Sequence, residues 1–201
     1  MQRYLLYKPE GEADSSNGSQ AGKRLEEVKS KLFASKPFGK WLKRISGGQV
    51  TAMAGETRRF RPGLDYTVAH HGQLETVERL DVTLCFVQDQ SPEAKMVWAS
   101  GDVGGFECYL AAEKEKNVAA EVYCDDDAEG YDLLSVSPVS NTVNIVLRDP
   151  GTMRFVKYIS GAGLSSRWDV SCAYAIDYSD DEAENEDEDG NDNDDADEND
   201  N

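Results

Sequence analysis

Histidine is nearly absent from this 201-residue chain, which contains only His70 and His71. Cysteine is also sparse: the four cysteines are widely spaced with no C-x-x-C pair, which fits neither a structural zinc site nor a disulfide scaffold. No apolar run approaches the length of about 18 residues that a membrane-spanning helix requires. These absences predict a protein of a reducing compartment, the cytoplasm or the nucleus, with no membrane partner.

Positive charge is missing from the C-terminal end of the chain. Residues 180–201 hold 14 of the 39 acidic residues and no Lys or Arg, which leaves 25 acidic and 21 basic residues elsewhere. The formal net charge of −18 therefore belongs mainly to a tail on a nearly neutral body. Such a polyanionic end repels phosphate backbones, so direct nucleic-acid binding is disfavoured and an electrostatic partner should be basic.

The distribution of apolar residues divides the chain into three parts. Hydrophobic residues make up 39% of the sequence, less than the roughly 45–50% of an average soluble domain, so part of the chain should stay outside the core. Residues 8–22 lack apolar periodicity and are rich in Gly, Ser and Asn. We therefore expect a flexible segment at 1–22, one domain at 23–178 and a disordered acidic tail at 179–201.

Helical spacing of apolar residues comes first within the predicted domain, and strand spacing follows. Leu25, Val28 and Leu32 predict one amphipathic helix, and residues 37–45 predict a second. In residues 79–87, apolar positions alternate with polar ones, which predicts a half-buried strand. The other strands are expected at 57–61, 66–70, 106–110, 118–124, 133–136, 142–147, 155–159 and 168–176. This pattern favours a mainly β double-sheet jelly roll with both helices packed outside it.

Several short runs, in order and at compatible spacing, resemble one known family across about residues 25 to 177. They are Arg58-Arg59-Phe60-Arg61-Pro62-Gly63 with Tyr66-Thr67, Gly104-Gly105-Phe106 with Tyr109, Pro138 with Asn141, Arg148-Asp149, the run at 155–159 and Trp168-Asp169. The chain resembles the C-terminal half, called the degradation domain, of the 2-oxoglutarate and Fe(II)-dependent prolyl 3-hydroxylases that modify a small-subunit ribosomal protein.

The resemblance implies a double-stranded β-helix of the jelly-roll or cupin-like type. It also implies that the catalytic half of the full-length family, with its Fe(II), 2-oxoglutarate and ascorbate, is missing from this chain. The partners it implies are that catalytic half and regulatory or ribosome-related proteins.

The ligands of a ferrous site can be sought directly in the sequence. A non-haem iron oxygenase needs two histidines and a carboxylate, and the first histidine and the acid must lie two positions apart on a strand to face the same cavity. His70 and His71 are adjacent, and the positions two residues further on hold Gly72 and Gln73. The distal histidine belongs on a late strand, where Tyr158 stands instead. We therefore predict no catalytic, cofactor or metal site, with His70, Gly72 and Tyr158 as degenerate ligand positions. An unusual site made of His70, Tyr158 and a carboxylate is the alternative.

Two further positions are functional candidates with a structural alternative each. Arg167 stands nine residues after Tyr158, roughly where such enzymes place the arginine that binds the far carboxylate of the keto acid, so it is a candidate anion site. A structural cation is the competing interpretation. Ser179 opens the acidic tail with Glu182 three positions later, a pattern that acidophilic kinases favour, so it is a candidate phosphorylation site. A solubilising disordered tail is the alternative.

Two other motifs are better explained by structure than by ligand binding. Alternation sends Arg59 and Arg61 to one face of a strand and Arg58 to the other, so this cluster is no nucleic-acid footprint. Gly104-Gly105 lacks both the G-x-G-x-x-G pattern and a following helix, so we expect a turn or bulge at a strand edge.

Three hypotheses for function follow from these observations. The first is a non-catalytic regulatory module that binds partner proteins and supports a catalytic half. The second is an active 2-oxoglutarate and Fe(II)-dependent peptidyl-proline dioxygenase, the activity of the family. The third is a protein whose acidic tail binds basic proteins.

Overall fold

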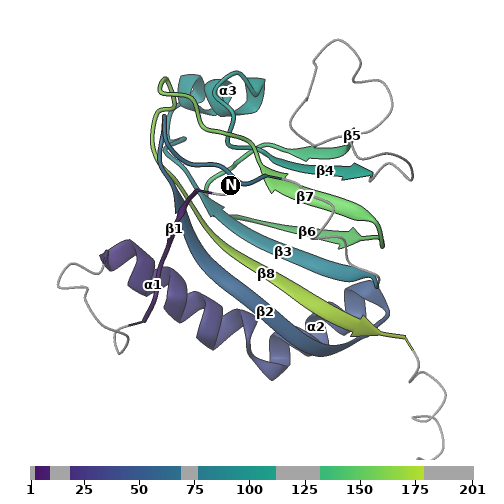
Figure 1. The fold of residues 1–201 in the computed structure, drawn as a ribbon. Coiled ribbons are helices and arrows are strands. Elements are labelled where there is room, and N and C mark those ends of the chain that lie inside the picture. Colours follow the sequence, from purple (N-terminus) through teal and green to yellow (C-terminus); the bar gives the residue numbers. More distant parts are fainter. Residues whose placement is uncertain (1–2, 10–18, 69–76, 112–131, 179–201) are drawn as a thin grey trace, which may run out of the picture.

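Two antiparallel sheets make up most of the structure (Figure 1). This computed structural model describes residues 3–9, 19–68, 77–111 and 132–178. All the strand pairs within each sheet are antiparallel, so the mainly β architecture predicted from the sequence is confirmed. In sheet order, the larger sheet contains β1 (Leu5–Leu6), β2 (Gln49–Phe60), β8 (Arg167–Asp177), β3 (Arg79–Phe86) and β6 (Thr142–Arg148), and the smaller sheet contains β5 (Asp132–Val136), β4 (Glu107–Ala111) and β7 (Thr152–Val156).

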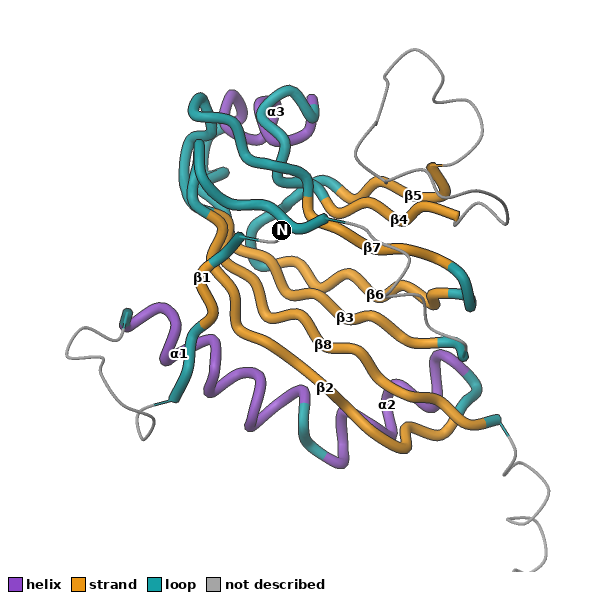
Figure 2. The backbone as a smooth tube through the Cα atoms, viewed as in Figure 1, coloured by secondary structure: helices purple, strands orange, loops and turns teal. Residues whose placement is uncertain are grey.

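Helices cover the outer face of the larger sheet, as the sequence predicts (Figure 2). α1 (Gln20–Val28) continues into a π-helical turn, η1 (Lys29–Phe33), and α2 (Lys36–Ser46) follows. The hydroxyl of Ser35 caps α2 by accepting a hydrogen bond at 3.3 Å from the backbone N–H three residues later. Gly47 ends α2 in the left-handed conformation, with φ of 78°. No helix in the described ranges is long and apolar enough to cross a membrane.

The main apolar core lies between these helices and the larger sheet. Leu80, Val82 and Leu84 of β3 face the helices, as the alternating pattern predicts. The prediction of a half-buried strand is wrong, however, because Asp81 and Thr83 are buried as well, under Arg148 of the adjacent strand β6 and Arg154 of β7 in the facing sheet. The core comprises Leu25, Phe33, Leu42, Leu80, Val82, Leu84, Val170, Cys172 and Tyr174.

A buried hydrogen bond ties the helical layer to this core. The hydroxyl of Tyr174 donates to the carbonyl oxygen of Phe33 at 2.9 Å. Tyr174→Phe removes the donor and keeps the ring, so we expect it to lower the free energy of unfolding by about 1 kcal/mol, measured by urea denaturation. Tyr178→Phe, at a side chain that is 47% exposed, should change it by less than about 0.5 kcal/mol. Equal losses in the two variants would contradict this assignment.

A second apolar cluster closes one end of the two sheets, away from α1 and α2 (Figure 1). It is built around α3 (Pro92–Ser100), a helix that the sequence did not predict. Trp98 of α3 is buried against Phe60 and Ile159, and its indole N–H donates to the carbonyl oxygen of Gln88 at 3.0 Å.

Several predicted strand bounds are wrong. β2 begins at Gln49 rather than at residue 57. The small residues in its first part allow α1 and η1 to pack close to the strand: a Cβ built on Gly55 would lie 3.4 Å from the Lys29 side chain. The strand expected at 155–159 is β7, which starts at Thr152 because the turn after β6 is tight, with Thr152 N donating to Asp149 O at 3.2 Å. Of the strand expected at 66–70, the described part forms only an isolated bridge, at Tyr66. The strand expected at 118–124 lies outside the described residues.

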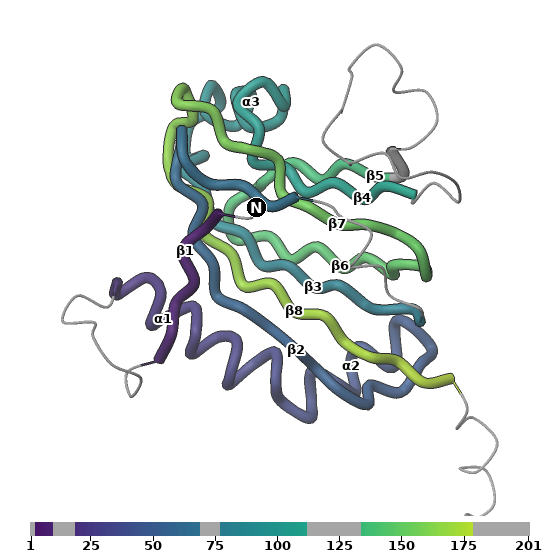
Figure 3. The backbone as a smooth tube through the Cα atoms, in the orientation of Figure 1, coloured from purple at the N-terminus to yellow at the C-terminus, as the bar shows by residue number. Residues whose placement is uncertain are grey.

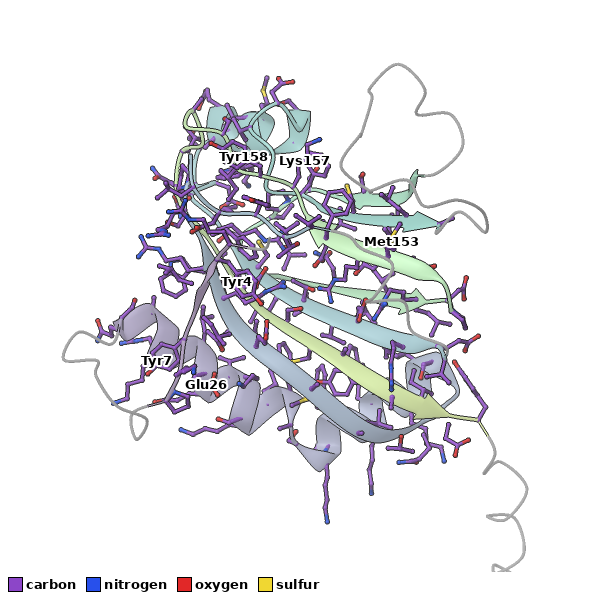
Figure 4. The ribbon with its side chains drawn as sticks, viewed as in Figure 1. Tyr4, Tyr7, Glu26, Met153, Lys157 and Tyr158 are labelled. Carbon is purple, nitrogen blue, oxygen red and sulfur yellow. The ribbon has the colours of Figure 1, made fainter. Side chains whose placement is uncertain are left out.

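The predicted N-terminal boundary at residue 23 is also too late. β1 pairs with β2 at the edge of the larger sheet, and α1 begins at Gln20. The N-terminal strand runs past α1, where a Cβ on Gly22 would lie 2.4 Å from the Tyr7 ring (Figure 4). The described parts of the first 22 residues therefore belong to the folded body. Residues 10–18 and the acidic tail at 179–201 lie outside the described residues.

Candidate functional site

Charged side chains fill the space between the two sheets, where the polar positions of the strands meet (Figure 4). None of these side chains is more than 14% exposed. We call this group the interior ion-pair layer. It consists of Arg58 from β2, Asp81 from β3, Glu107 from β4, Arg148 from β6, Arg154 from β7, and Arg167 and Asp169 from β8.

Asp169 joins two arginines of the larger sheet. Its carboxylate accepts two hydrogen bonds from Arg58, from Nε at 2.8 Å and from Nη2 at 3.1 Å, which is the bidentate geometry that Arg favours. Arg167 Nε donates to the same carboxylate at 3.1 Å, and Arg167 also donates to the carbonyl oxygen of Gly105. Because the Asp169 side chain is fully buried, its charge is balanced by these arginines rather than by solvent.

Glu107 joins the smaller sheet to the larger one. Arg154 Nε donates to Glu107 Oε1 at 2.8 Å, and Arg154 Nη2 donates to the hydroxyl of Thr83 at 2.6 Å. Arg58 and Arg167 each place a nitrogen 4.0 Å from Glu107 Oε1. One carboxylate of the smaller sheet is thus surrounded by three guanidinium groups, two of them from the larger sheet.

Asp81 is the least well satisfied member of the layer. Arg148 Nε donates to Asp81 Oδ2 at 2.8 Å. Oδ1 lies 3.5 Å from Arg154 Nη1 but, within the described part of the chain, accepts no hydrogen bond. Arg154 therefore contributes charge to this oxygen without a direct hydrogen bond.

The arginines control the ionisation of the buried carboxyls. Burial by itself raises the pKa of Glu107 and of Asp169, because it penalises the charged form. The positive charges around both groups outweigh burial and hold each pKa below its ordinary value. Both groups are therefore ionised at neutral pH, and neither is suited to exchange a proton near pH 7.

These lowered pKa values predict a loss of stability in acid. A carboxyl with a lower pKa in the folded state stabilises the fold above its unfolded-state pKa, and that contribution disappears as pH falls through the folded-state value. We expect the free energy of unfolding to change little between about pH 5 and 8 and to fall below about pH 4. Urea denaturation across this range measures it. The Asp169→Asn variant should show a shallower fall, and a slope equal to that of the unchanged protein would contradict the assignment to this layer.

A cavity of about 230 Å³ opens beside the layer. Its wall includes Arg58, Glu107 and Arg154, together with Glu56 of β2 and Tyr4 of the N-terminal segment. The Tyr4 hydroxyl donates to Glu56 Oε2 at 3.0 Å. The volume is sufficient for several water molecules, at about 30 Å³ each. Because cationic and anionic groups share the wall, the cavity suits water or a small polar molecule better than an isolated ion.

Arg167, the candidate anion site, faces carboxylates of the chain itself. It is 2% exposed and lies 3.0 Å from Asp169 and 4.0 Å from Glu107. This arrangement matches the competing interpretation of a structural cation. Anion binding at Arg167 remains a prediction, and an anion there would have to compete with two fixed carboxylates.

The degenerate ligand positions do not meet in the described part of the molecule. Tyr158 lies beyond the end of β7, is 44% exposed and packs edge-on against Tyr66, with ring centroids 6.5 Å apart (Figure 4). It is therefore outside the interior ion-pair layer. His70 and Gly72 lie outside the described residues, as does Ser179.

Alternation along β2 predicted the directions of its arginines correctly. Arg58 points into the interior, whereas Arg59 donates to the hydroxyl of Ser166 at 3.0 Å. Arg61 lies just beyond the end of β2 and pairs with Asp65 at 2.8 Å, so alternation along the strand is not tested there. Sequence reasoning did not recognise the interior ion-pair layer itself. The available signal is that polar residues recur at every second position in β3 and in the first half of β8, a pattern that is typical of a solvated strand face.

A family model matches residues 1–182 of this chain, and its description is "Oxoglutarate and iron-dependent oxygenase degradation C-term". The chain is 37% identical to "Prolyl 3,4-dihydroxylase OGFOD1" of Ostreococcus tauri over 175 residues, which cover 87% of this chain and 33% of that protein. It is 28% identical to "Prolyl 3-hydroxylase OGFOD1" of Mus musculus over 174 residues, or 82% of this chain and 25% of that protein. The chain thus spans between a quarter and a third of the length of these relatives.

Two solved structures are more distantly similar. A prolyl hydroxylase in complex with a hypoxia inducible factor oxygen degradation domain peptide fragment, from Trichoplax adhaerens, gives a TM-score of 0.42 at 14% identity over 80% of this chain and 58% of that one. An oxalate oxidase gives 0.32 at 15% identity over 87% and 75%. Scores this low do not establish a shared topology.

Proposed function

The chain belongs to the family of oxoglutarate and iron-dependent oxygenase degradation C-terminal domains, and on that premise we propose that it is a non-catalytic, partner-binding half of a prolyl hydroxylase-like protein. Its two facing antiparallel sheets are consistent with a degenerate double-stranded β-helix. The proposed partners are a catalytic half and regulatory or ribosome-related proteins, in the cytoplasm or the nucleus.

The interior ion-pair layer is the observation that supports this proposal. A ferrous oxygenase site needs imidazole and carboxylate ligands with open coordination positions. Each carboxylate of the interior ion-pair layer is already paired with at least one guanidinium, and guanidinium groups are not metal ligands. Among the described residues, no group of three or more His, Cys, Asp or Glu side chains is placed to hold a metal. The residues between the sheets therefore do not fit iron.

On this proposal, the interior ion-pair layer links the two sheets directly. Arg154 of the smaller sheet donates to Thr83 of the larger one, and Glu107 of the smaller sheet lies 4.0 Å from nitrogens of Arg58 and Arg167. A rigid scaffold held in this way is suited to presenting its outer surface to other proteins. On this proposal, any oxygenase chemistry belongs to the part of the relatives that this chain does not match.

Iron binding provides the first test. Anaerobic titration of the full chain with ferrous ion, followed by removal of free metal and elemental analysis, should leave far less than one iron per chain. Addition of 2-oxoglutarate should not change the result. Stoichiometric iron, with turnover of 2-oxoglutarate in air, would instead establish the active-oxygenase alternative.

Partner binding provides the second test. Analytical ultracentrifugation of the full chain mixed with the catalytic half of a prolyl hydroxylase from the same source should reveal a complex. The complex should survive about 0.5 M salt if it is formed by the folded surface, since salt screens exposed charges over a few ångströms at such concentrations. Binding that disappears in salt, and that also occurs with unrelated basic proteins, would favour the acidic-tail alternative. Failure to bind any candidate would count against the proposal.

A further inference from the structure

α2 presents two adjoining rows of exposed side chains on its outer surface. Residues four apart on a helix lie one above the other, so each row runs along the helix axis. Trp41 is 45% exposed and Ile45 is 50% exposed. The apolar row is Pro37, Trp41 and Ile45; the other, which we call the basic row, is Lys36, Lys40 and Arg44.

The charge of the basic row is not balanced within the described structure. Residues 20–46 contain eight basic and two acidic residues. Both acids are in α1, where Glu26 pairs with Lys29 and Glu27 pairs with Lys31. In the described ranges, none of the basic residues of α2 forms an ion pair with an acidic side chain.

Helix stability does not explain the basic row. Positive charge at the C-terminal end of a helix interacts favourably with the helix dipole, which accounts for Lys43 and Arg44. Lys36, however, is the first residue of α2, where positive charge is unfavourable. Lys40 gains nothing from the dipole either. The helix dipole therefore does not account for Lys36 and Lys40.

The chain leaves the described structure beside α2. Asp177, the last residue of β8, is opposite Gln49, three residues after the end of α2 (Figures 1 and 3). Tyr178 is close to Gly48, since a Cβ built on that glycine would lie 2.9 Å from the tyrosine ring. α2 is only about 16 Å long at 1.5 Å per residue. The 22 residues from 180 to 201 can extend about 70 Å at 3.3 Å per residue, so they can reach the whole helix.

We propose that the acidic segment 180–201 binds in cis along the basic row of α2. The segment has 14 acidic residues, no basic residue and only two alanines as apolar side chains, so it complements the basic row and leaves the apolar row open. A tethered segment acts at an effective concentration in the millimolar range, which compensates for the weakness of individual exposed ion pairs. The inference does not depend on the proposed function. Its consequence is that the chain masks its own basic surface and competes with acidic partners for it.

Zero-length carbodiimide crosslinking of the full chain tests this contact. We expect Lys36 and Lys40 to form amide links to carboxylates of residues 180–201, identified by mass spectrometry. In an equal mixture of ¹⁴N- and ¹⁵N-labelled protein, each link should join two residues that carry the same isotope, because a contact in cis lies within one chain. At about 1 M salt, where the screening length falls to about 3 Å, they should decrease at least five-fold. Lys95, an exposed lysine of α3 at the opposite end of the molecule, is the internal control and should form few links.

Charge reversal on α2 provides the second readout. Lys40→Glu should reduce the links from Lys36 to the acidic segment several-fold and make the fluorescence of the neighbouring Trp41 insensitive to salt. Lys95→Glu makes the same change in net charge on another exposed helical lysine and should alter neither signal. Links distributed equally between Lys95 and α2, links between differently labelled chains, or no links at all would each overturn the proposal.

Discussion

Asp169→Asn is expected to lower the free energy of unfolding by about 3–5 kcal/mol. The substitution keeps the shape of the side chain and removes its charge. Arg58 and Arg167 would then share a buried site with a neutral amide, and among the carboxylates of the described residues only Glu107, 4.0 Å from a nitrogen of each, would still pair with them. Neither guanidinium can lose its proton to relieve this situation. Urea denaturation at pH 7, monitored by circular dichroism, measures the loss.

An exposed ion pair provides the matched control for Asp169→Asn. Glu27 lies 3.6 Å from Lys31, and the two side chains are 50% and 76% exposed. Glu27→Gln should therefore cost no more than about 1 kcal/mol. Replacing Arg58 and Asp169 together by leucine and asparagine should recover part of the loss, because it removes a buried charge along with its partner. If Asp169→Asn cost no more than Glu27→Gln, the buried pairs of Asp169 with Arg58 and Arg167 would not stabilise the larger sheet.

The helices and strands that face the apolar core were predictable from the sequence, because their apolar pattern depends only on which side of each element packs against that core. Leu25 of α1 and Leu42 of α2 recur at helical spacing, and Leu80 and Val82 alternate along β3, so each element shows the side that faces the core. These predictions required no knowledge of which strands pair.

The charged interior was not predictable in the same way. Asp81 and Asp169 occupy the polar positions of alternating strands, which normally face water. What places them inside is the smaller sheet, whose Glu107 and Arg154 come from strands far along the chain. Whether a polar strand face is solvated or covered depends on such long-range pairing, and no local pattern reports it. For this reason the sequence identifies Arg167 as a candidate but does not identify Asp169 as its partner.

α3 was missed although its ends carry recognisable signals. Ser91 caps the helix by accepting a hydrogen bond from Ala94 N at 3.2 Å, Pro92 is its first residue and Gly101 ends it with φ of 80°. The helix has little amphipathic pattern, since Met96 is 70% exposed, so apolar periodicity did not reveal it. Attention to the Ser-Pro start and the glycine at the end would have found it.

Gly104 and Gly105, the two consecutive glycines before β4, form a backbone turn. Gly104 N donates to Gly101 O at 2.9 Å and Gly105 N donates to Lys157 O at 3.1 Å, which is the turn predicted from the sequence rather than a phosphate cradle. Gly104 has φ of 73°, and a Cβ there would lie 1.9 Å from the carbonyl oxygen of Tyr158. The glycine therefore permits both a left-handed backbone and a close approach of two chain segments.

Gly104→Ala is accordingly expected to cost about 3 kcal/mol or more, because left-handed strain adds to displacement of the backbone at Tyr158. Gly151→Ala separates the two effects. Gly151 has φ of 78° but nothing within 4 Å of its Cβ position, so that variant should lose only the strain energy of about 1–2 kcal/mol. Chemical denaturation of both variants measures the difference. Equal losses would mean that the backbone at Gly104 and the backbone at Tyr158 can move apart at no cost. The contact between these two segments would then not stabilise the end of the sandwich where α3 packs.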